Sequence, residues 1–210
     1  MFDYISHHWI RYTTLVTQHI LLSATALVVC ICVGGLVGTL CFRNRWFNVL
    51  AMNTSGAVRV IPSLVILLLL MPILGTGFFP AVTALVLLGL PPVIIGTALA
   101  LDSIDDDVIE AALSCGMNDR CIFREIRLPL AMPMIITGMR LSALSIAAGA
   151  TLAAYVGAGG LGELILSGLS QYRMDILLAG AVTTMAISLA IEAVFQLLHA
   201  MATRHRVNVH

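Results

Sequence analysis

The 210-residue sequence contains no lysine, because its eleven basic residues are all arginine. A P-loop needs a lysine to reach the nucleotide phosphates, and Schiff-base chemistry needs one as nucleophile, so both are excluded. Six histidines lie near the two chain ends: His7, His8, His19, His199, His205 and His210. They cannot supply a two-histidine metalloprotease helix or a proton relay inside a membrane. An enzymatic function is therefore disfavoured, and we expect no metal site.

Charged residues are also scarce, at 10% of the chain, whereas hydrophobic residues make up 60%. Soluble domains average about 25% charged and 45–50% apolar residues. A net charge of zero excludes nothing by itself, since in a membrane protein the placement of charges is what matters. The composition indicates that the bilayer is the natural solvent of this chain.

Long apolar runs bear this out, in five stretches of about twenty residues: 20–42, 61–80, 78–101, 134–154 and 176–198. Backbone amides in hydrocarbon must be bonded within their own segment, so each run is predicted to be a helix that spans the ~30 Å core. The predicted fold is all-α, a polytopic membrane protein with five transmembrane helices. Residues 1–19 would form an extracytoplasmic segment, 20–198 the transmembrane domain and 199–210 a cytoplasmic tail.

The arginines are distributed unevenly between the predicted loops. Eight fall on one side of the predicted membrane: Arg43, Arg45, Arg59, Arg120, Arg124, Arg127, Arg204 and Arg206. Only Arg11 and Arg173 fall on the other side, and Arg140 lies inside the fourth run. Since positive charge marks cytoplasmic loops, we expect a multi-pass protein of the cytoplasmic membrane with its N-terminus outside and its C-terminus cytoplasmic.

The one long polar stretch, residues 102–133, is predicted to lie in the cytoplasm and to form two short helices. Acidic residues crowd the start of the first helix, where the helix dipole favours anions. Gly116 is placed to end that helix in a left-handed turn, and Asn118 or Asp119 can cap the next. Pro129 is expected to stop the second helix before the fourth span begins. A helix-turn-helix of this kind is suited to being held by another protein.

This stretch resembles the EAA signature of ATP-binding-cassette (ABC) importer permeases, through Glu110-Ala111-Ala112, then Gly116, then Ile126-x-Leu128-Pro129. The resemblance implies the type I importer permease fold and a loop that couples to an ATPase subunit. Residues to which it assigns that contact are Glu110, Ala111, Ala112, Gly116, Met117, Asn118, Asp119, Arg120 and Cys121.

Three further segments resemble the branch of the family that imports glycine betaine, carnitine and choline: 59–64 (RVIPSL), 150–154 (ATLAA) and 157–162 (GAGGLG). The resemblance implies an osmoprotectant as the solute. Methionine importer permeases share the five spans and a similar glycine cluster, so methionine or another small solute is the alternative.

Several residues are candidates for a gate or pathway: Pro62, Ser63, Gly157, Gly159, Gly160, Gly162 and Glu192. Prolines and glycines within apolar runs suit helices that move or line a cavity, although a kink braced by neighbouring helices is an equal alternative. The glycine segment lacks the preceding strand that a dinucleotide site requires, so a flexible bend near an external gate is predicted, with a plain loop as the equal alternative. Glu192 should face protein or water, and Arg140 should either snorkel or pair across helices.

The resemblance also implies partners: ATPase subunits that hold ATP and Mg²⁺, a second permease subunit identical or paralogous to this one, and an extracytoplasmic solute-binding protein. The chain has few candidates for an aromatic cage around a quaternary ammonium, because its Trp and Tyr residues lie at predicted helix ends and interfaces, so high-affinity recognition is assigned to the binding protein. Membrane lipid is expected around the chain, with no cofactor of its own and no nucleic-acid partner. A secondary transporter without an ATPase and an intramembrane enzyme are the alternatives from other classes.

Overall fold

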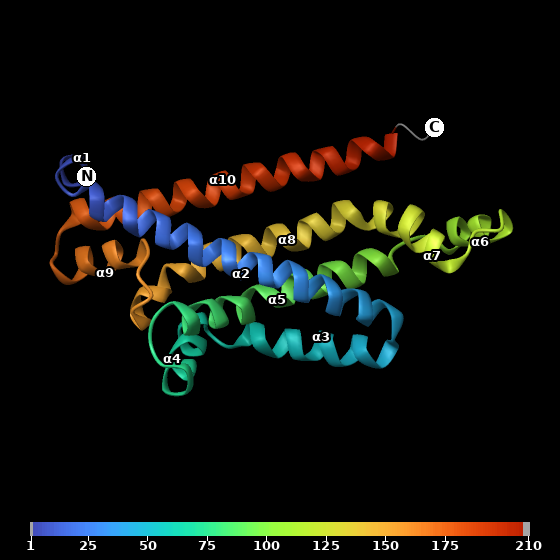
Figure 1. The fold of residues 1–210 in the computed structure, drawn as a ribbon, viewed down its shortest axis with the longest axis horizontal. Coiled ribbons are helices and arrows are strands. Elements are labelled where there is room, and N and C mark those ends of the chain that lie inside the picture. The colour runs from blue at the N-terminus through green and yellow to red at the C-terminus, as the bar shows by residue number, and fades with distance from the viewer. Residues whose placement is uncertain (1, 208–210) are drawn as a thin grey trace.

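The computed structural model describes residues 2–207, without the side chains of residues 2, 3, 45, 57–59 and 204–207, and every regular element in it is a helix (Figure 1). The elements are α1 (Phe2–His7), α2 (Trp9–Arg43), α3 (Arg45–Val60), α4 (Ser63–Leu74), α5 (Phe78–Asp102), α6 (Asp106–Ser114), α7 (Asp119–Cys121), the π-helix η1 (Ile122–Arg127), α8 (Leu128–Ala150), the 3₁₀ helix η2 (Leu152–Val156), α9 (Gly162–Ser170) and α10 (Met174–Val207). The all-α prediction is confirmed.

In the part of the chain that the structure describes, four helical stretches are long and apolar enough to cross a membrane: Trp9–Arg43, Phe78–Asp102, Asp119–Ala150 and Met174–Thr203. They match the first, third, fourth and fifth expected spans, although the first begins at Trp9 rather than Ile20. Helix therefore covers most of the segment 1–19.

The second expected span, 61–80, is not one continuous helix. Its apolar part, α4, has 12 residues, about 18 Å of helix, which is short of the ~30 Å hydrocarbon core. The 16-residue α3 precedes it and packs beside α2 and α5. Pro62 breaks the helix, since it has no N–H to donate and disfavours helical backbone at Ile61. The second passage is thus divided between α3 and α4.

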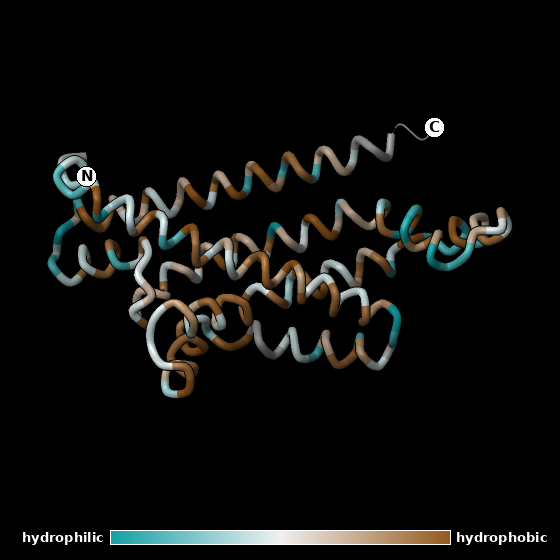
Figure 2. The backbone as a smooth tube through the Cα atoms, in the orientation of Figure 1, coloured by the Kyte–Doolittle hydropathy of each residue, from teal (hydrophilic) through white to brown (hydrophobic). Residues whose placement is uncertain are grey.

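The bundle has two polar ends and an apolar middle (Figures 1 and 2). The α6–α7 segment, the α2–α3 joint and the end of α10 lie at one end, here called the loop end. The N-terminal helix, α9 and the glycine segment 157–162 lie at the other, here called the glycine end. Arg59 is at the far end of α3 from Arg45, so it does not lie with Arg43 at the loop end as the arginine count assumed.

Helix α5 is the centre of the bundle and packs closely against α2. A Cβ on Gly34 would lie 2.9 Å from Val93, and one on Gly38 would lie 2.6 Å from the Cβ of Thr97. Small residues at this spacing let helices approach closely where lipid provides no hydrophobic drive for association. The main hydrophobic core lies where α2, α5 and α8 meet and includes Leu22 and Ile146.

Helix α5 meets α8 at two further glycines. A Cβ on Gly138 would lie 2.8 Å from the carbonyl oxygen of Pro92, and one on Gly96 would lie 2.9 Å from the Cα of Gly138. The neighbours there are backbone atoms, which cannot rotate away. This crossing therefore tolerates only glycine.

We predict that Gly138→Ala lowers the thermal unfolding temperature in detergent, because the added methyl group overpacks the crossing at a cost of about 1–3 kcal/mol. Gly35→Ala is the matched control, since a Cβ on Gly35 meets nothing within 4 Å. That control should be neutral or slightly stabilising because alanine is the better helix former. Equal melting temperatures for the two variants would contradict the close packing of α5 against α8 at Gly138.

Candidate functional site

The polar segment at the loop end begins with α6, which has a defined start. The side chain of Asp105 accepts a hydrogen bond from the backbone N–H of Asp107 at 3.1 Å, as an N-cap residue does. Asp106 and Asp107 follow in the first turn, where the helix dipole favours negative charge.

Gly116 ends α6 in the predicted left-handed turn, with φ of 81°. The N–H of Met117 donates to the carbonyl of Ala112 at 3.2 Å, and the N–H of Gly116 donates to that of Leu113 at 2.9 Å. These are the two bonds of a Schellman motif, and its positive φ strains every residue except glycine. The turn prediction is confirmed.

The next helix begins at the predicted cap, Asn118, whose side chain accepts from the N–H of Cys121 at 2.9 Å. It does not stop at Pro129, because helix is continuous from Asp119 to Ala150. The π-helix η1 precedes the proline, and directly after it the backbone N–H of Leu128 donates to the carbonyl of Phe123, five residues back. We attribute the continuity to this wider turn, which relieves the clash of the Pro129 ring with the preceding turn.

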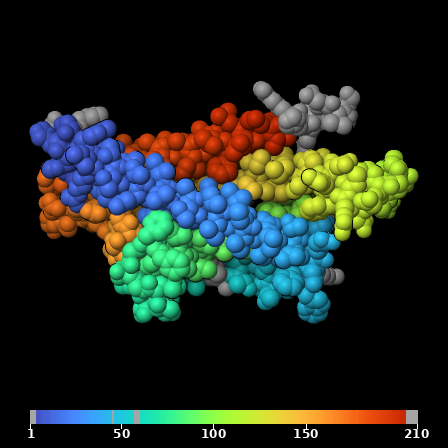
Figure 3. Space-filling view, viewed as in Figure 1, coloured from blue at the N-terminus to red at the C-terminus, as the bar shows by residue number. Residues whose placement is uncertain are grey.

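Most signature residues of the segment point away from the bundle. Glu110, Ala111, Gly116, Asn118, Asp119 and Arg120 are exposed, Met117 and Cys121 are half-buried, and Ala112 is buried. The apolar side chains Val108 and Leu113 are 41% and 50% exposed. The segment projects beyond the other helices (Figure 3), so it offers a surface of mixed apolar and acidic character to a partner.

Arg127 ties the segment to the bundle. Its guanidinium donates to the carbonyl oxygen of Leu101 at 3.1 Å and lies 4.9 Å from the ring centroid of Phe42. Ile122 is buried at 3% exposure, and Phe123 packs on the core cluster that includes Leu101. A displacement of the segment would therefore reach the ends of α2, α5 and α8 directly.

The gate candidates do not assemble into one site. Pro62 and Ser63 line a surface cavity of about 810 Å³ with Ser145 and Thr151 of the α8 region. Gly157 and Gly159 line another cavity, of about 660 Å³, at the glycine end. Glu192 lines neither cavity.

The glycine segment bends as predicted, with positive φ at Gly157, Gly159 and Gly160. Gly162 is different: it begins α9 and lies against the carbonyl of Thr151, where a Cβ has no room. The Oε1 atom of Gln18 accepts from the N–H of Gly160 at 3.1 Å. The bend is therefore held against α2.

Sequence reasoning missed the polar residues that hold this end together. Arg11 of α2 pairs with Glu163 of α9 at 2.6 Å, beside the Gln18 bond. His19 is fully buried against Gly160, and within the described residues neither ring nitrogen has a hydrogen-bond partner. The one available signal was that the polar residues Gln18 and His19 directly precede the first apolar run. Residue spacing alone does not show which helices they contact.

Glu192 pairs with Arg140 across the α8–α10 contact, with an N–O distance of 3.2 Å and side-chain exposures of 28% and 32%. Gln196 donates to the same carboxylate at 2.9 Å. Of the two outcomes expected for Arg140, pairing across helices is the one observed. Since each charge offsets the other, the pair contributes a structural tether between α8 and α10.

We predict that Glu192→Gln lowers the thermal unfolding temperature, because it leaves Arg140 unpaired within a membrane-spanning helix, where a charge at the helix centre costs about 2.5–3.5 kcal/mol. The double variant Arg140→Gln/Glu192→Gln should recover much of the loss. Gln196→Ala, which removes a hydrogen bond and no charge, is the control. A double variant less stable than either single one would contradict the pairing.

Comparisons with known proteins agree with this architecture. A family model described as "Binding-protein-dependent transport system inner membrane component" matches residues 30–204. The carnitine transport permease protein OpuCB of Listeria monocytogenes is 34% identical, over 83% of this chain and 80% of its own. The glycine betaine/carnitine/choline permease protein OpuCB of Bacillus subtilis is 30% identical, over 84% and 82%.

Among solved structures, a chain of the inward-facing MetNI methionine ABC transporter superposes with a TM-score of 0.81, covering 93% of this chain and 97% of its own. The two sequences are 18% identical, so this likeness concerns the fold alone. It confirms the type I importer permease fold. The chain therefore belongs to the binding-protein-dependent transport system inner membrane components, the non-enzymatic, multi-pass permease subunits of ABC importers.

Proposed function

We propose that this permease carries a small osmoprotectant, such as glycine betaine, carnitine or choline, across the cytoplasmic membrane. The observation that supports it is the 34% identity to a carnitine permease along most of both chains. Methionine is less well supported, because the methionine transporter resembles this chain in fold at 18% identity only.

The segment from Asp105 to Cys121 is proposed to dock on an ATPase subunit that binds ATP and Mg²⁺. It projects from the bundle, its exposed Leu113 offers an apolar anchor, and Glu110 offers a charge beside it. Arg127 and Ile122 connect it to the transmembrane helices. ATP binding would pull the paired loops together and open the permease outward, and hydrolysis would reset it.

The cavity beside Pro62 and Ser63 is proposed to form part of the pathway when a second permease subunit, identical or paralogous, lies against it. Its polar lining offers few free groups: the Ser145 hydroxyl donates to Leu141 at 2.8 Å, and that of Thr151 donates to Ala148 at 2.7 Å. A solute would meet weak sites here. This is consistent with an external binding protein that supplies high affinity and docks at the glycine end.

The loop end is proposed to be cytoplasmic, with the N-terminus outside and the C-terminus inside. Four arginines at that end support this orientation: Arg43, Arg120, Arg124 and Arg127.

The coupling role is tested by ATP-driven uptake of glycine betaine in proteoliposomes that contain the permease, its ATPase and its binding protein. We expect Gly116→Val to insert normally but to lower uptake about tenfold, because a β-branched residue at positive φ costs about 1–3 kcal/mol and displaces the turn. Cys115→Val is the control, since φ there is −78°. Uptake at the wild-type rate by Gly116→Val would refute the coupling role. Uptake of methionine but not of glycine betaine would refute the proposal that the solute is an osmoprotectant.

The orientation is tested by labelling intact cells with a membrane-impermeant maleimide. Cys115 is exposed at the loop end, so it should react only after permeabilisation. Because the chain has other free cysteines, the label on Cys115 is measured as the fraction of labelling that is lost in the Cys115→Ser variant. Labelling of Cys115 in intact cells would place the loop outside.

A further inference from the structure

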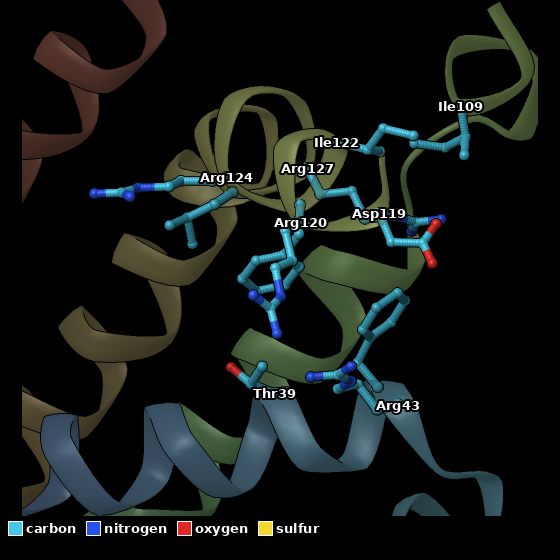
Figure 4. Close-up of a pocket in the computed structure, with 11 residues that line it drawn as sticks. Thr39, Arg43, Ile109, Asp119, Arg120, Ile122, Arg124 and Arg127 are labelled. Atoms are coloured by element: carbon cyan, nitrogen blue, oxygen red, sulfur yellow. The ribbon is translucent and has the colours of Figure 1, made fainter. Parts of the chain in front are cut away.

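A cavity of about 690 Å³ at the loop end lies between the end of α2 and the α7–α8 segment, and the coupling role leaves it unexplained (Figure 4). Its charged lining consists of Arg43, Arg120, Arg124, Arg127 and Asp119. Apolar side chains complete it, among them Phe42 and Phe123. The cavity is therefore strongly cationic, with one carboxylate against four guanidiniums.

None of these four arginines has a carboxylate partner among the described residues. The salt bridges found in the described part of the chain involve Arg11, Arg140 and Arg173, and Arg127 is held by the carbonyl of Leu101. In Figure 4, Arg120 points from the loop toward α2, where Arg43 lies below it, and Arg124 extends outward. Arg120 and Arg43 therefore flank the cavity without a carboxylate partner in the described residues, and such a pair favours an anion, above all a phosphate group.

An apolar groove of about 450 Å³ continues from this cavity along α2. Its lining follows one helical stripe: Ile31, Cys32, Gly35, Leu36, Thr39, Leu40 and Arg43. Thr39 and Arg43 belong to both hollows, so the two are contiguous. At Gly35 a Cβ would meet nothing within 4 Å, which leaves the middle of the groove open.

The length of the groove matches one leaflet of a bilayer. From Ile31 to Arg43 the helix rises about 18 Å, close to half of the ~30 Å hydrocarbon core. Arg43 is the last residue of a membrane-spanning helix, so the cationic cavity lies at headgroup level. An occupant would thus have a charged head at the surface and a tail in the hydrocarbon.

We propose that this composite hollow binds an anionic phospholipid, with its headgroup phosphate between Arg43 and Arg120 and one acyl chain along the Gly35 groove. Free phosphate would leave the groove unused, and a carboxylate of the ATPase could not reach along α2 into the membrane. The bound lipid connects the end of α2 to the segment that meets the ATPase. The inference requires a bilayer around the chain and is independent of which solute is carried.

Trp46 provides a local reporter, because it is 86% exposed and follows Arg43 closely in the chain. Trp9 lies near the glycine end of α2, so the Trp9→Phe chain retains a single tryptophan near the cavity. This full chain is reconstituted in phosphatidylcholine bilayers that contain brominated phosphatidylglycerol, whose bromines quench tryptophan. The reference is the same mixture with bromine on the phosphatidylcholine.

We expect brominated phosphatidylglycerol to quench more than its share of the bilayer predicts. Arg43→Gln/Arg120→Gln should remove this excess, at about fivefold weaker binding for each arginine lost. Gly35→Leu should reduce the excess by filling the groove. The matched control Gly56→Leu, on an exposed and open helical position, should not reduce it. Arg173→Gln, at the other end, is the charge control.

The proposal is overturned if the excess survives the arginine substitutions, or if Gly35→Leu leaves it intact. If the variants fold poorly, a competition experiment on the chain without the arginine substitutions tests the proposal. Glycerol phosphate in excess should compete only weakly with brominated phosphatidylglycerol. Complete loss of the excess quenching would instead assign the cavity to a soluble phosphate. Since no transport is measured, a wrong solute or a wrong ATPase contact leaves these outcomes unaffected.

Discussion

Direct contact between helix backbones is the constraint on which the rest of this structure depends. Lipid tails are as apolar as leucine, so helices in a bilayer gain little from hiding apolar surface and instead need close packing. Here α5 meets α2 at Gly34 and Gly38, and it meets α8 at Gly96 and Gly138. The Ser142 hydroxyl of α8 also donates to a carbonyl of α5 at 2.7 Å, within a fully buried contact. These contacts pack α2, α5 and α8 into one closely fitted unit.

The projecting segment is attached to that unit and to little else. It leaves α5 after Asp102 and returns as the continuous helix that becomes α8, with Arg127 bonded back to Leu101. Helix α10, by contrast, packs on α8 and α9, and α4 packs on α5 and η2. On the proposed mechanism, a pull on the loop would tilt the central unit against its neighbours. A proline normally interrupts a helix, but the helix from Asp119 to Ala150 is continuous through Pro129. Such a helix would transmit a pull over its whole length.

The features that the sequence predicted well are those set by local chemistry. The turn at Gly116 and the cap at Asn118 depend on residues within one helical turn, and apolar run length determines most of the spans. The division of the second passage was not predictable in this way, because α3 is amphipathic and its polar side resembles a loop. Pro129 misled for a related reason: a π turn is not encoded in apolar periodicity.

The candidate site shows the same division between local and tertiary information. The residues proposed to contact the ATPase all lie between Glu110 and Cys121, so they fall on a single projecting segment. The gate candidates were collected from separate helices, and they lie in different places because spacing shows which face a residue occupies but not which helix it meets. Gln18 and Arg11 hold the glycine end through partners far along the chain, so only the tertiary structure reveals their role.

The arginines at the two ends of the bundle differ in whether they have a carboxylate partner. Wherever their side chains are described, those at the glycine end and within the membrane have carboxylate partners: Arg11 with Glu163, Arg173 with Asp175, and Arg140 with Glu192. Those around the cationic cavity do not. A paired arginine satisfies its charge inside the protein and fixes the shape of the bundle, whereas an unpaired one retains its charge for something outside. Surface pairs contribute little to stability, so leaving the loop-end arginines unpaired costs the fold little and keeps that end available to partners and lipid.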